Sequence, residues 1–319
     1  MPIGVTERRV ARPIRDCHNT PSPATIGNDY NQWMLLSMCY RASMAVVTTL
    51  AAVSLHLGSL PAALAEFPAH TPVPGGIAVV PVTGERKPTV RIGDRRIAVV
   101  RDNGRWLAVA GIPLDTPTGP LTLDVISETA RTSQAIEIGT RNYREQHLTI
   151  KEKRYVNPDA AELARYRTER QTMDDARASW RDSNTVAVFE LVPVPGKRSD
   201  SFGSRRFFNG QPRNPHSGMD IAAPAGTPVR APAAGIVAAT GDFFFNGKTV
   251  MLDHGNGLVT LYCHLSEVLV TKGDRITLGE TIGLVGATGR VTGAHLHWSV
   301  YLSGVAIDPS LMLSSDAAP

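Results

Sequence analysis

Two histidines near the C-terminus, His295 and His297, are spaced like a pair of ligands on one face of a β-strand. The run 295–302 is rich in residues that favour strands, and successive side chains of a strand point to opposite faces. The two imidazoles should therefore point the same way, while Leu296 and Trp298 point into a core. Imidazole is a common metal ligand, so the pair is one half of a candidate metal site.

The other half of this candidate site lies upstream, in the stretch P-H-S-G-M-D, which contains His216 and Asp220. Pro215 and Gly218 favour a loop over a helix, and a turn can fold both ligands back on one point. Imidazole and carboxylate suit zinc, and three protein ligands with one open position are typical of a catalytic zinc site. A lone histidine is more often a hydrogen-bonded core residue, but five of the nine histidines lie between positions 216 and 297.

Four stretches, in order, resemble the lysostaphin-type, or LytM-domain, zinc metallopeptidases. The resemblance covers residues from about 190 to 315, and Val291 and Ala294 are small departures at positions that are not candidate ligands. The matching stretches are S-F-G-S-R-R (201–206), H-S-G-M-D-I-A-A-P-A-G-T-P-V-R-A-P (216–232), D-H-G-N-G-L-V-T-L-Y-C-H-L (253–265) and T-G-R-V-T-G-A-H-L-H-W (288–298).

This resemblance implies one Zn²⁺ ion per chain, held by His216, Asp220 and His297. Strand alternation does not choose between His295 and His297 as the third ligand; the family pattern does, because its second histidine of H-x-H binds the metal. The resemblance also implies that His264 and His295 are the catalytic residues that face the reacting group. An ordinary histidine pKa of about 6.5 suits proton transfer at neutral pH.

Three further residues are weaker candidates for substrate binding. Arg206 and Asn209 lie just ahead of the first ligand motif. Tyr262 should share a wall with His264 by strand alternation, although a packed tyrosine is an equally good interpretation. The same alternation predicts that Cys263 faces away from the site, into a core.

The composition is that of an ordinary folded protein, with 42% hydrophobic and 19% charged residues. The formal net charge is +4, and the first 65 residues, with five arginines and three acidic residues, carry half of that excess. So weak a basic balance does not predict nucleic-acid binding. Cys17, Cys39 and Cys263 have neither metal-ligand spacing nor the pattern of a disulfide framework.

Residues 1–65 are predicted to be a leader. An uncharged, mostly apolar stretch, 42–60, follows Arg41, and Ala63-Leu64-Ala65 has the small-x-small pattern of a signal-peptide cleavage site. The rival interpretation is an uncleaved membrane anchor through 42–60. Both predict an exported protein of the periplasm or cell envelope. Because the signal begins late, one hypothesis places the true start at an internal methionine: Met34, Met38 or Met44.

Residues 66–155 contain short alternating or apolar runs separated by turn signals, the strongest being Asp102-Asn103-Gly104. They predict a small β-sandwich module. Residues 156–185 have a helical period and predict a helical connector. Its N-cap is expected at Asn157, with Pro158 at the first helical position.

Strand signals resume over 186–319, which predict an antiparallel β peptidase domain with a groove. The fold class is therefore mainly β, or α+β overall. Histidine pairs of this kind and the family resemblance imply a zinc-dependent endopeptidase whose partners are peptidoglycan stem peptides. The order of modules looks closest to the Gram-negative murein endopeptidases, which implies hydrolysis of cross-links between D-Ala and diaminopimelate.

A non-catalytic LytM-domain regulator, which binds the wall and activates amidases, is the alternative. Five polar residues retained in a groove would carry a desolvation cost without a metal, which favours the enzyme. A structural zinc site would need a fourth protein ligand, typically cysteine. The sequence does not indicate an oligomeric state.

Overall fold

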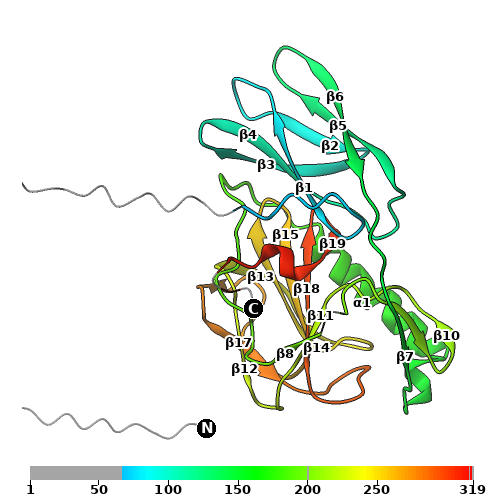
Figure 1. The fold of residues 1–319 in the computed structure, drawn as a ribbon. Coiled ribbons are helices and arrows are strands. Elements are labelled where there is room, and N and C mark those ends of the chain that lie inside the picture. Colours follow the sequence, from blue (N-terminus) through cyan, green and yellow to red (C-terminus); the bar gives the residue numbers. More distant parts are fainter. Residues whose placement is uncertain (1–66, 200, 316, 318–319) are drawn as a thin grey trace, which may run out of the picture. The chain divides into compact units, whose positions relative to one another are not determined.

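The computed structural model describes residues 67–199, 201–315 and 317, and these are folded mainly as antiparallel β-sheets with one α-helix (Figure 1). The predicted fold class is confirmed. The predictions for the leader and for the stretch 42–60 lie outside the described residues. Within the described part of the chain, no helix is both long and apolar enough to cross a membrane.

The N-terminal part is a six-stranded antiparallel sheet in the order β1-β4-β3-β2-β5-β6. The predicted turn at 102–104 connects β3 to β4, with positive φ at Asn103 and Gly104. Apolar side chains from all six strands meet in one cluster, so the sheet curls over a core of its own. The strands are β1 (Ile77–Val82), β2 (Thr89–Ile92), β3 (Arg95–Asp102), β4 (Arg105–Gly111), β5 (Gly119–Ile126) and β6 (Arg131–Ile138).

Strand β3 is buried on both faces. Ile97 and Val99 join the core of the six-stranded sheet, whereas Ala98 and Val100 join the main core of the C-terminal part. An ion pair of 2.6 Å between Arg141 Nη2 and Asp308 Oδ2 adds a polar contact between the two parts.

A connector follows, made of β7 (Glu145–Leu148), a 3-10 turn (Lys153–Tyr155) and α1 (Ala160–Arg177). The predicted N-cap at Asn157 is wrong: Asp159 caps the helix, accepting a 2.8 Å hydrogen bond from the Glu162 N–H. Glu162 in turn accepts a 3.0 Å bond from the Asp159 N–H. This reciprocal capping box satisfies two helix-end N–H groups, which outweighs the Asn-Pro signal that begins two residues earlier.

The C-terminal part is built on one long antiparallel sheet, in the order β16-β13-β14-β15-β18-β11-β8, with β12, β17 and β19 attached at its side. A second small sheet has the order β10-β9-β7, so the connector supplies one of its strands. A final 3-10 turn spans Pro309–Met312. The strands are β8 (Lys197–Arg198), β9 (Arg205–Phe208), β10 (Gln211–Pro212), β11 (Met219–Ala222), β12 (Pro228–Arg230), β13 (Gly235–Phe243), β14 (Gly247–Gly255), β15 (Leu258–Val268), β16 (Arg275–Ile276), β17 (Thr281–Val285), β18 (Leu296–Leu302) and β19 (Val305–Ile307).

Strand β18 separates two layers. Leu296 and Trp298 point into the main core, as alternation predicts, and Phe189 packs there against Trp298 with ring centroids 5.6 Å apart. The opposite face of β18 carries His297 and Tyr301, and Tyr301 packs in a smaller cluster under helix α1. The polar side chains of the site therefore lie on the helix side of the sheet.

Candidate active site and metal centre

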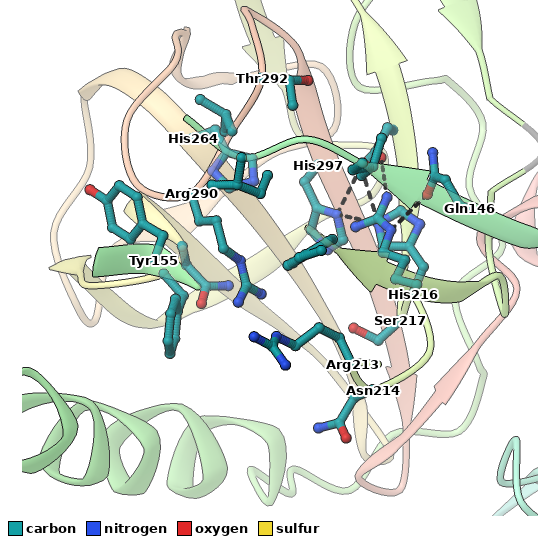
Figure 2. A pocket seen from close by; sticks show the side chains of 18 of the residues that line it. Gln146, Tyr155, Arg213, Asn214, His216, Ser217, His264, Arg290, Thr292 and His297 are labelled. Carbon is teal, nitrogen blue, oxygen red and sulfur yellow. Dashed lines mark hydrogen bonds and ion pairs between the residues drawn. The ribbon is translucent and has the colours of Figure 1, made fainter. Parts of the chain in front are cut away.

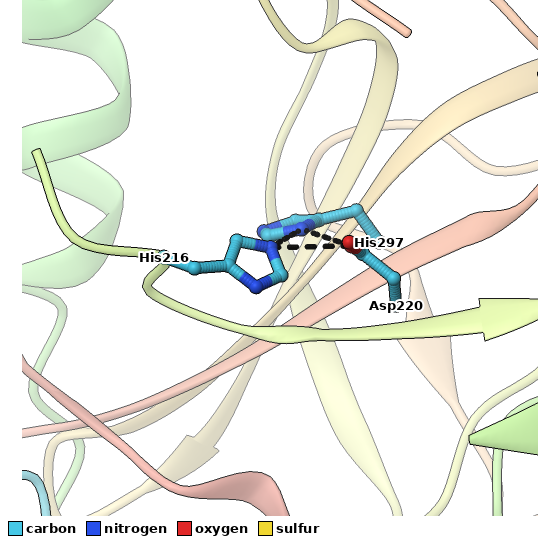
Figure 3. Close-up of side chains that lie close together, drawn as sticks. All are labelled: His216, Asp220 and His297. Atoms are coloured by element: carbon cyan, nitrogen blue, oxygen red, sulfur yellow. Dashed lines mark hydrogen bonds and ion pairs between the residues drawn. The ribbon is translucent and has the colours of Figure 1, made fainter. Parts of the chain in front are cut away.

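His216, Asp220 and His297 converge on one point from three segments of the chain (Figure 3). His216 lies in the loop before β11, where its N–H donates to the Ser204 carbonyl at 3.0 Å. Asp220 on β11 is directly opposite His297 on the neighbouring strand β18. The antiparallel pairing therefore fixes two of the three side chains against each other, and the loop brings the third.

The three inward atoms have the spacing of ligands of a single ion. His216 Nε2 lies 2.9 Å from His297 Nδ1, and Asp220 Oδ1 lies 3.2 Å and 3.0 Å from these two nitrogens. Tetrahedral ligands at ordinary zinc distances would lie about 3.3 Å apart. Two imidazoles and one carboxylate are also a donor set that zinc accepts, and three ligands leave a fourth position open.

The outer nitrogens of both imidazoles are already used. His216 Nδ1 lies 3.0 Å from the Ser201 carbonyl and so must donate to it. His297 Nε2 lies 2.8 Å from Ser299 Oγ, which can accept its proton. These tautomers leave both inward nitrogens with a lone pair, which is how metal-binding histidines are usually held by their second partner.

Burial keeps the two imidazoles neutral, and contacts with them keep the carboxylate charged. Burial lowers the pKa of His216 to about 4, and it also lowers the pKa of His297. Burial alone would raise the pKa of Asp220, but its contacts with His216 and His297 outweigh this and lower that pKa below its ordinary value. At neutral pH the cluster therefore presents one negative charge and two lone pairs, which suits a divalent cation.

His264 and His295 lie beside this cluster, with their rings 5.0 Å apart between centroids. His264 Nδ1 donates to the Thr288 carbonyl at 2.9 Å, and His295 Nδ1 donates to the Gly293 carbonyl at 2.8 Å. Each Nε2 is thereby left as a proton acceptor. Burial holds the pKa of His264 well below its ordinary value, so this ring is neutral at pH 7.

The comparisons with known proteins identify the family of the chain. Residues 214–309 match Peptidase family M23, and residues 70–141 match the Peptidase family M23 N-terminal domain. A crystal structure from Pseudomonas aeruginosa, described as a peptidase M23, is 36% identical, covers 80% of this chain and 98% of its own, and has a TM-score of 0.65. The chain belongs to peptidase family M23.

Curated relatives match over shorter stretches of the chain. Peptidoglycan DD-endopeptidase ShyA of Vibrio cholerae is 43% identical over 120 residues, 37% of this chain and 28% of the relative. DD-carboxypeptidase/endopeptidase Mpg of Neisseria meningitidis is 47% identical over 94 residues, 30% of this chain and 22% of the relative. The match spans less than a third of the length of either relative. The predicted lysostaphin-type resemblance is confirmed at the level of the family.

In this M23 chain, Arg206 lies at the site but is held by other protein groups. Its Nη2 lies 2.7 Å from Asp220 Oδ2, and its Nε donates to Gln146 Oε1 at 2.8 Å. Burial lowers the pKa of Arg206, and the charge of Asp220 opposes that effect. The guanidinium therefore orients the candidate ligand carboxylate from behind, a contact that the spacing of the two residues in sequence does not reveal.

The prediction that Tyr262 contacts substrate is wrong, and so is the predicted direction of Cys263. Tyr262 is fully buried in the main core, with its hydroxyl 2.9 Å from Thr260 Oγ1. Cys263 pairs with His297 across the strands and packs on the helix side of the sheet. The cause is a β-bulge: the register of β14 against β15 shifts, and His264 has a φ of 64°. His264 is the extra residue, which turns it to the groove.

Asn209, also predicted to contact substrate, does not line the cavity, and its amide is bonded to the backbone instead. Asn209 Oδ1 accepts from the Ile150 N–H at 2.8 Å, and Asn209 Nδ2 donates to the Ile150 carbonyl at 3.0 Å. Its φ of 50° places it at the tip of the β9–β10 hairpin. The Asn-Gly dipeptide is a hairpin signal that could have identified this role.

A cavity of about 1140 Å³ surrounds the candidate metal centre of the M23 domain (Figure 2). Its histidines come from β15, from β18 and from the loops that precede β11 and β18. The connector lines the cavity through Gln146, Tyr155 and Tyr166. Sequence reasoning assigned no chemistry to the connector, and only contacts distant in sequence show that it forms a wall. The sequence also gave no indication of a role for Asn246. This residue lines the cavity, and its backbone carbonyl accepts from the His264 N–H at 2.9 Å.

Proposed function

We propose that this chain is a zinc-dependent endopeptidase that hydrolyses peptide cross-links of peptidoglycan between D-Ala and diaminopimelate. The observation that carries the proposal is the convergence of three atoms with free lone pairs, from His216, Asp220 and His297, in one cavity with His264 and His295. The names of the relatives ShyA and Mpg support the substrate class.

His216 Nε2, Asp220 Oδ1 and His297 Nδ1 are the atoms proposed to hold the metal. A zinc ion supplies Lewis acidity, which activates water and polarises a carbonyl at neutral pH. His264 and His295 then serve as the proton acceptors and donors. Their Nε2 atoms take the proton of the attacking water and return one to the leaving amine, because hydrogen bonds at Nδ1 fix the rings in that tautomer.

The proposal includes export, since peptidoglycan lies in the cell envelope. It also keeps the predicted division into a leader (1–65), a small β module (66–155), a connector (156–185) and a peptidase domain (186–319). Stem peptides are the proposed partners. Chemical determination of the N-terminus of the mature protein would test the leader: a protein beginning at Glu66 would support signal cleavage.

Digestion of purified peptidoglycan followed by mass analysis of the fragments tests the activity. We expect the zinc-loaded protein to release monomeric stems from cross-linked dimers. A chelator should abolish the release, and Asp220→Ala should reduce it at least about 100-fold, because a catalytic metal centre loses a ligand. His147→Ala is the matched control, since His147 is exposed and lies outside the cavity lining.

If wild type and Asp220→Ala release the same fragments at the same rate, the endopeptidase proposal is wrong. If neither cleaves but both bind peptidoglycan and stimulate an amidase, the regulator alternative replaces it.

A further inference from the structure

The cavity around the metal centre carries a large excess of positive charge. Among the described residues, Asp220 is the one carboxylate that lines it. Five arginines line it as well: Arg170, Arg177, Arg206, Arg213 and Arg290. Three of the five have a carboxylate partner, because Arg170 and Arg177 share Asp174 and Arg206 pairs with Asp220. Arg213 and Arg290 have no carboxylate partner within the described part of the chain.

Arg290 is held in place through the faces of its guanidinium. Its Cζ lies 4.7 Å from the centroid of the Phe208 ring and 4.4 Å from that of Phe245. The backbone N–H of Arg290 donates to the Phe245 carbonyl at 2.9 Å, which fixes the main chain at this position as well. Contact with aromatic rings uses the face of a guanidinium and leaves its in-plane N–H donors available.

Arg213 is held by neutral oxygens. Its Nη1 donates to the Pro212 carbonyl at 2.9 Å, and its Nη2 donates to the Val156 carbonyl at 2.7 Å and to Gln211 Oε1 at 2.8 Å. These contacts orient the side chain without cancelling its charge. Arg213 and Arg290 line the same cavity (Figure 2), and the charge of Arg213 is near enough to lower the pKa of Arg290.

Two like charges held together in a partly buried cavity are unfavourable unless an anion joins them. Burial, with the charges of Arg206 and Arg213, lowers the pKa of Arg290 to about 10, which still leaves it charged at neutral pH. A planar guanidinium pair matches the two oxygens of a carboxylate in geometry and charge.

We propose that Arg213 and Arg290 form a binding site for a carboxylate of the stem peptide, next to the metal centre. This inference rests on the proposed function. In a link between D-Ala and diaminopimelate, the carbon bonded to the scissile nitrogen bears a free carboxylate, whereas a residue inside a glycine bridge has none. A second carboxylate lies at the free end of a stem. The arginine pair therefore selects carboxylate-bearing stems over glycine bridges.

Calorimetric binding of uncleavable monomeric stems to the zinc-loaded protein tests the site. Three stems are compared: one with all carboxylates, one with the diaminopimelate carboxylate converted to carboxamide, and one with the terminal carboxylate converted. We expect one of the two conversions to weaken binding about 10- to 100-fold, as loss of a charged hydrogen-bonded pair does, and that conversion identifies the carboxylate. Equal binding of all three stems, or no binding, overturns the proposal.

Variants connect the preference to the two arginines. Arg290→Gln and Arg213→Gln should each remove most of the difference between carboxylate and carboxamide stems, while Arg290→Lys should keep part of it. Arg275→Gln, exposed on β16 and outside the cavity, is the matched control. Melting temperatures identify any of these three arginine variants that unfolds, and the two that stay folded then test the assignment. Variants that weaken both kinds of stem equally overturn the assignment.

The cleavage assay separates this inference from the proposed function. If the carboxylate stem binds preferentially but no cross-linked dimer is cleaved, the endopeptidase proposal fails and the anion site stands. If native and fully carboxamidated dimers are cleaved with the same kcat/KM, the activity stands and the anion site fails.

Discussion

Gly218 has no functional group, yet the geometry of the candidate metal centre depends on it. A Cβ at this position would lie 2.5 Å from Ser299 Oγ and 2.8 Å from His297 Cε1. Neither atom belongs to a flexible chain end, because Ser299 holds the outer nitrogen of His297. The absence of a side chain lets the loop that carries His216 approach the strand that carries the other imidazole.

Gly218→Ala should therefore weaken zinc binding about 10- to 100-fold, as changes to groups behind a ligand usually do. Competition with a chromophoric chelator measures this. Gly293→Ala is the control in the same cavity, because a Cβ there meets nothing within 4 Å. Equal zinc affinity of the two variants would show that the loop adapts without moving His297.

His254 allows a prediction about acid stability. It is buried, with Nδ1 donating to the Ala234 carbonyl at 2.8 Å, and burial lowers its pKa to about 4. An unfolded chain takes up this proton near pH 6.5, before the folded one does, so the free energy of unfolding falls as pH drops from about 6.5 to about 4. The loss from this residue is about 3 kcal/mol.

Urea unfolding of wild type and His254→Gln at pH 7 and pH 4 isolates that contribution. The variant is expected to be less stable at pH 7 but to lose about 3 kcal/mol less on acidification. Equal losses in both proteins would mean that His254 is not held neutral by its surroundings.

At the scale of elements, β15 explains which parts of the site the sequence could predict. Strand β18 keeps strict alternation, so the common direction of His295 and His297 and the inward direction of Trp298 followed from pattern, whereas the separate roles predicted for the two histidines came from the family resemblance. The bulge at His264 does not follow from pattern, because it depends on Asn246 and Thr288, which come from other loops. The start of helix α1 likewise depended on a choice between two local signals that only the structure decides.

The bulge predicts that glycine is more stabilising than alanine at position 264, the reverse of the usual order in a strand. Non-glycine residues at positive φ are strained by about 1–2 kcal/mol, so His264→Gly should be more stable than His264→Ala by about 1 kcal/mol. At Glu267, an exposed position further along the same strand, glycine should instead be the less stable of the pair. Thermal unfolding of the four variants measures both differences, and the same order at both positions would contradict the bulge.

On the scale of the whole described chain, the six-stranded sheet and the peptidase part share one core. Val100 and Val109 pack in the same cluster as Leu302 and Ile307. Gly111 lies at this junction, where a Cβ would be 3.0 Å from Ile307 Cγ2. Two parts joined through a common apolar cluster should unfold together.

Calorimetry is accordingly expected to record one unfolding transition. Gly111→Ala should lower its midpoint by about 2–4 °C, because overpacking a tight contact costs about 1 kcal/mol. Gly139→Ala is the control, since its Cβ would make an ordinary 3.6 Å contact, and its midpoint should stay or rise. Two separate transitions would mean that the parts fold independently.

Because β7 pairs in parallel with β9 and the segment after it lines the cavity, the catalytic unit extends upstream of its histidine motifs. A chimera joined at residue 186 would lack the connector residues that form one wall of this cavity. A junction placed before Glu145, where β7 begins, keeps these residues with the histidine motifs. Chimeras joined there should keep their cleavage preference, whereas those joined at 186 should lose it even with every metal ligand retained.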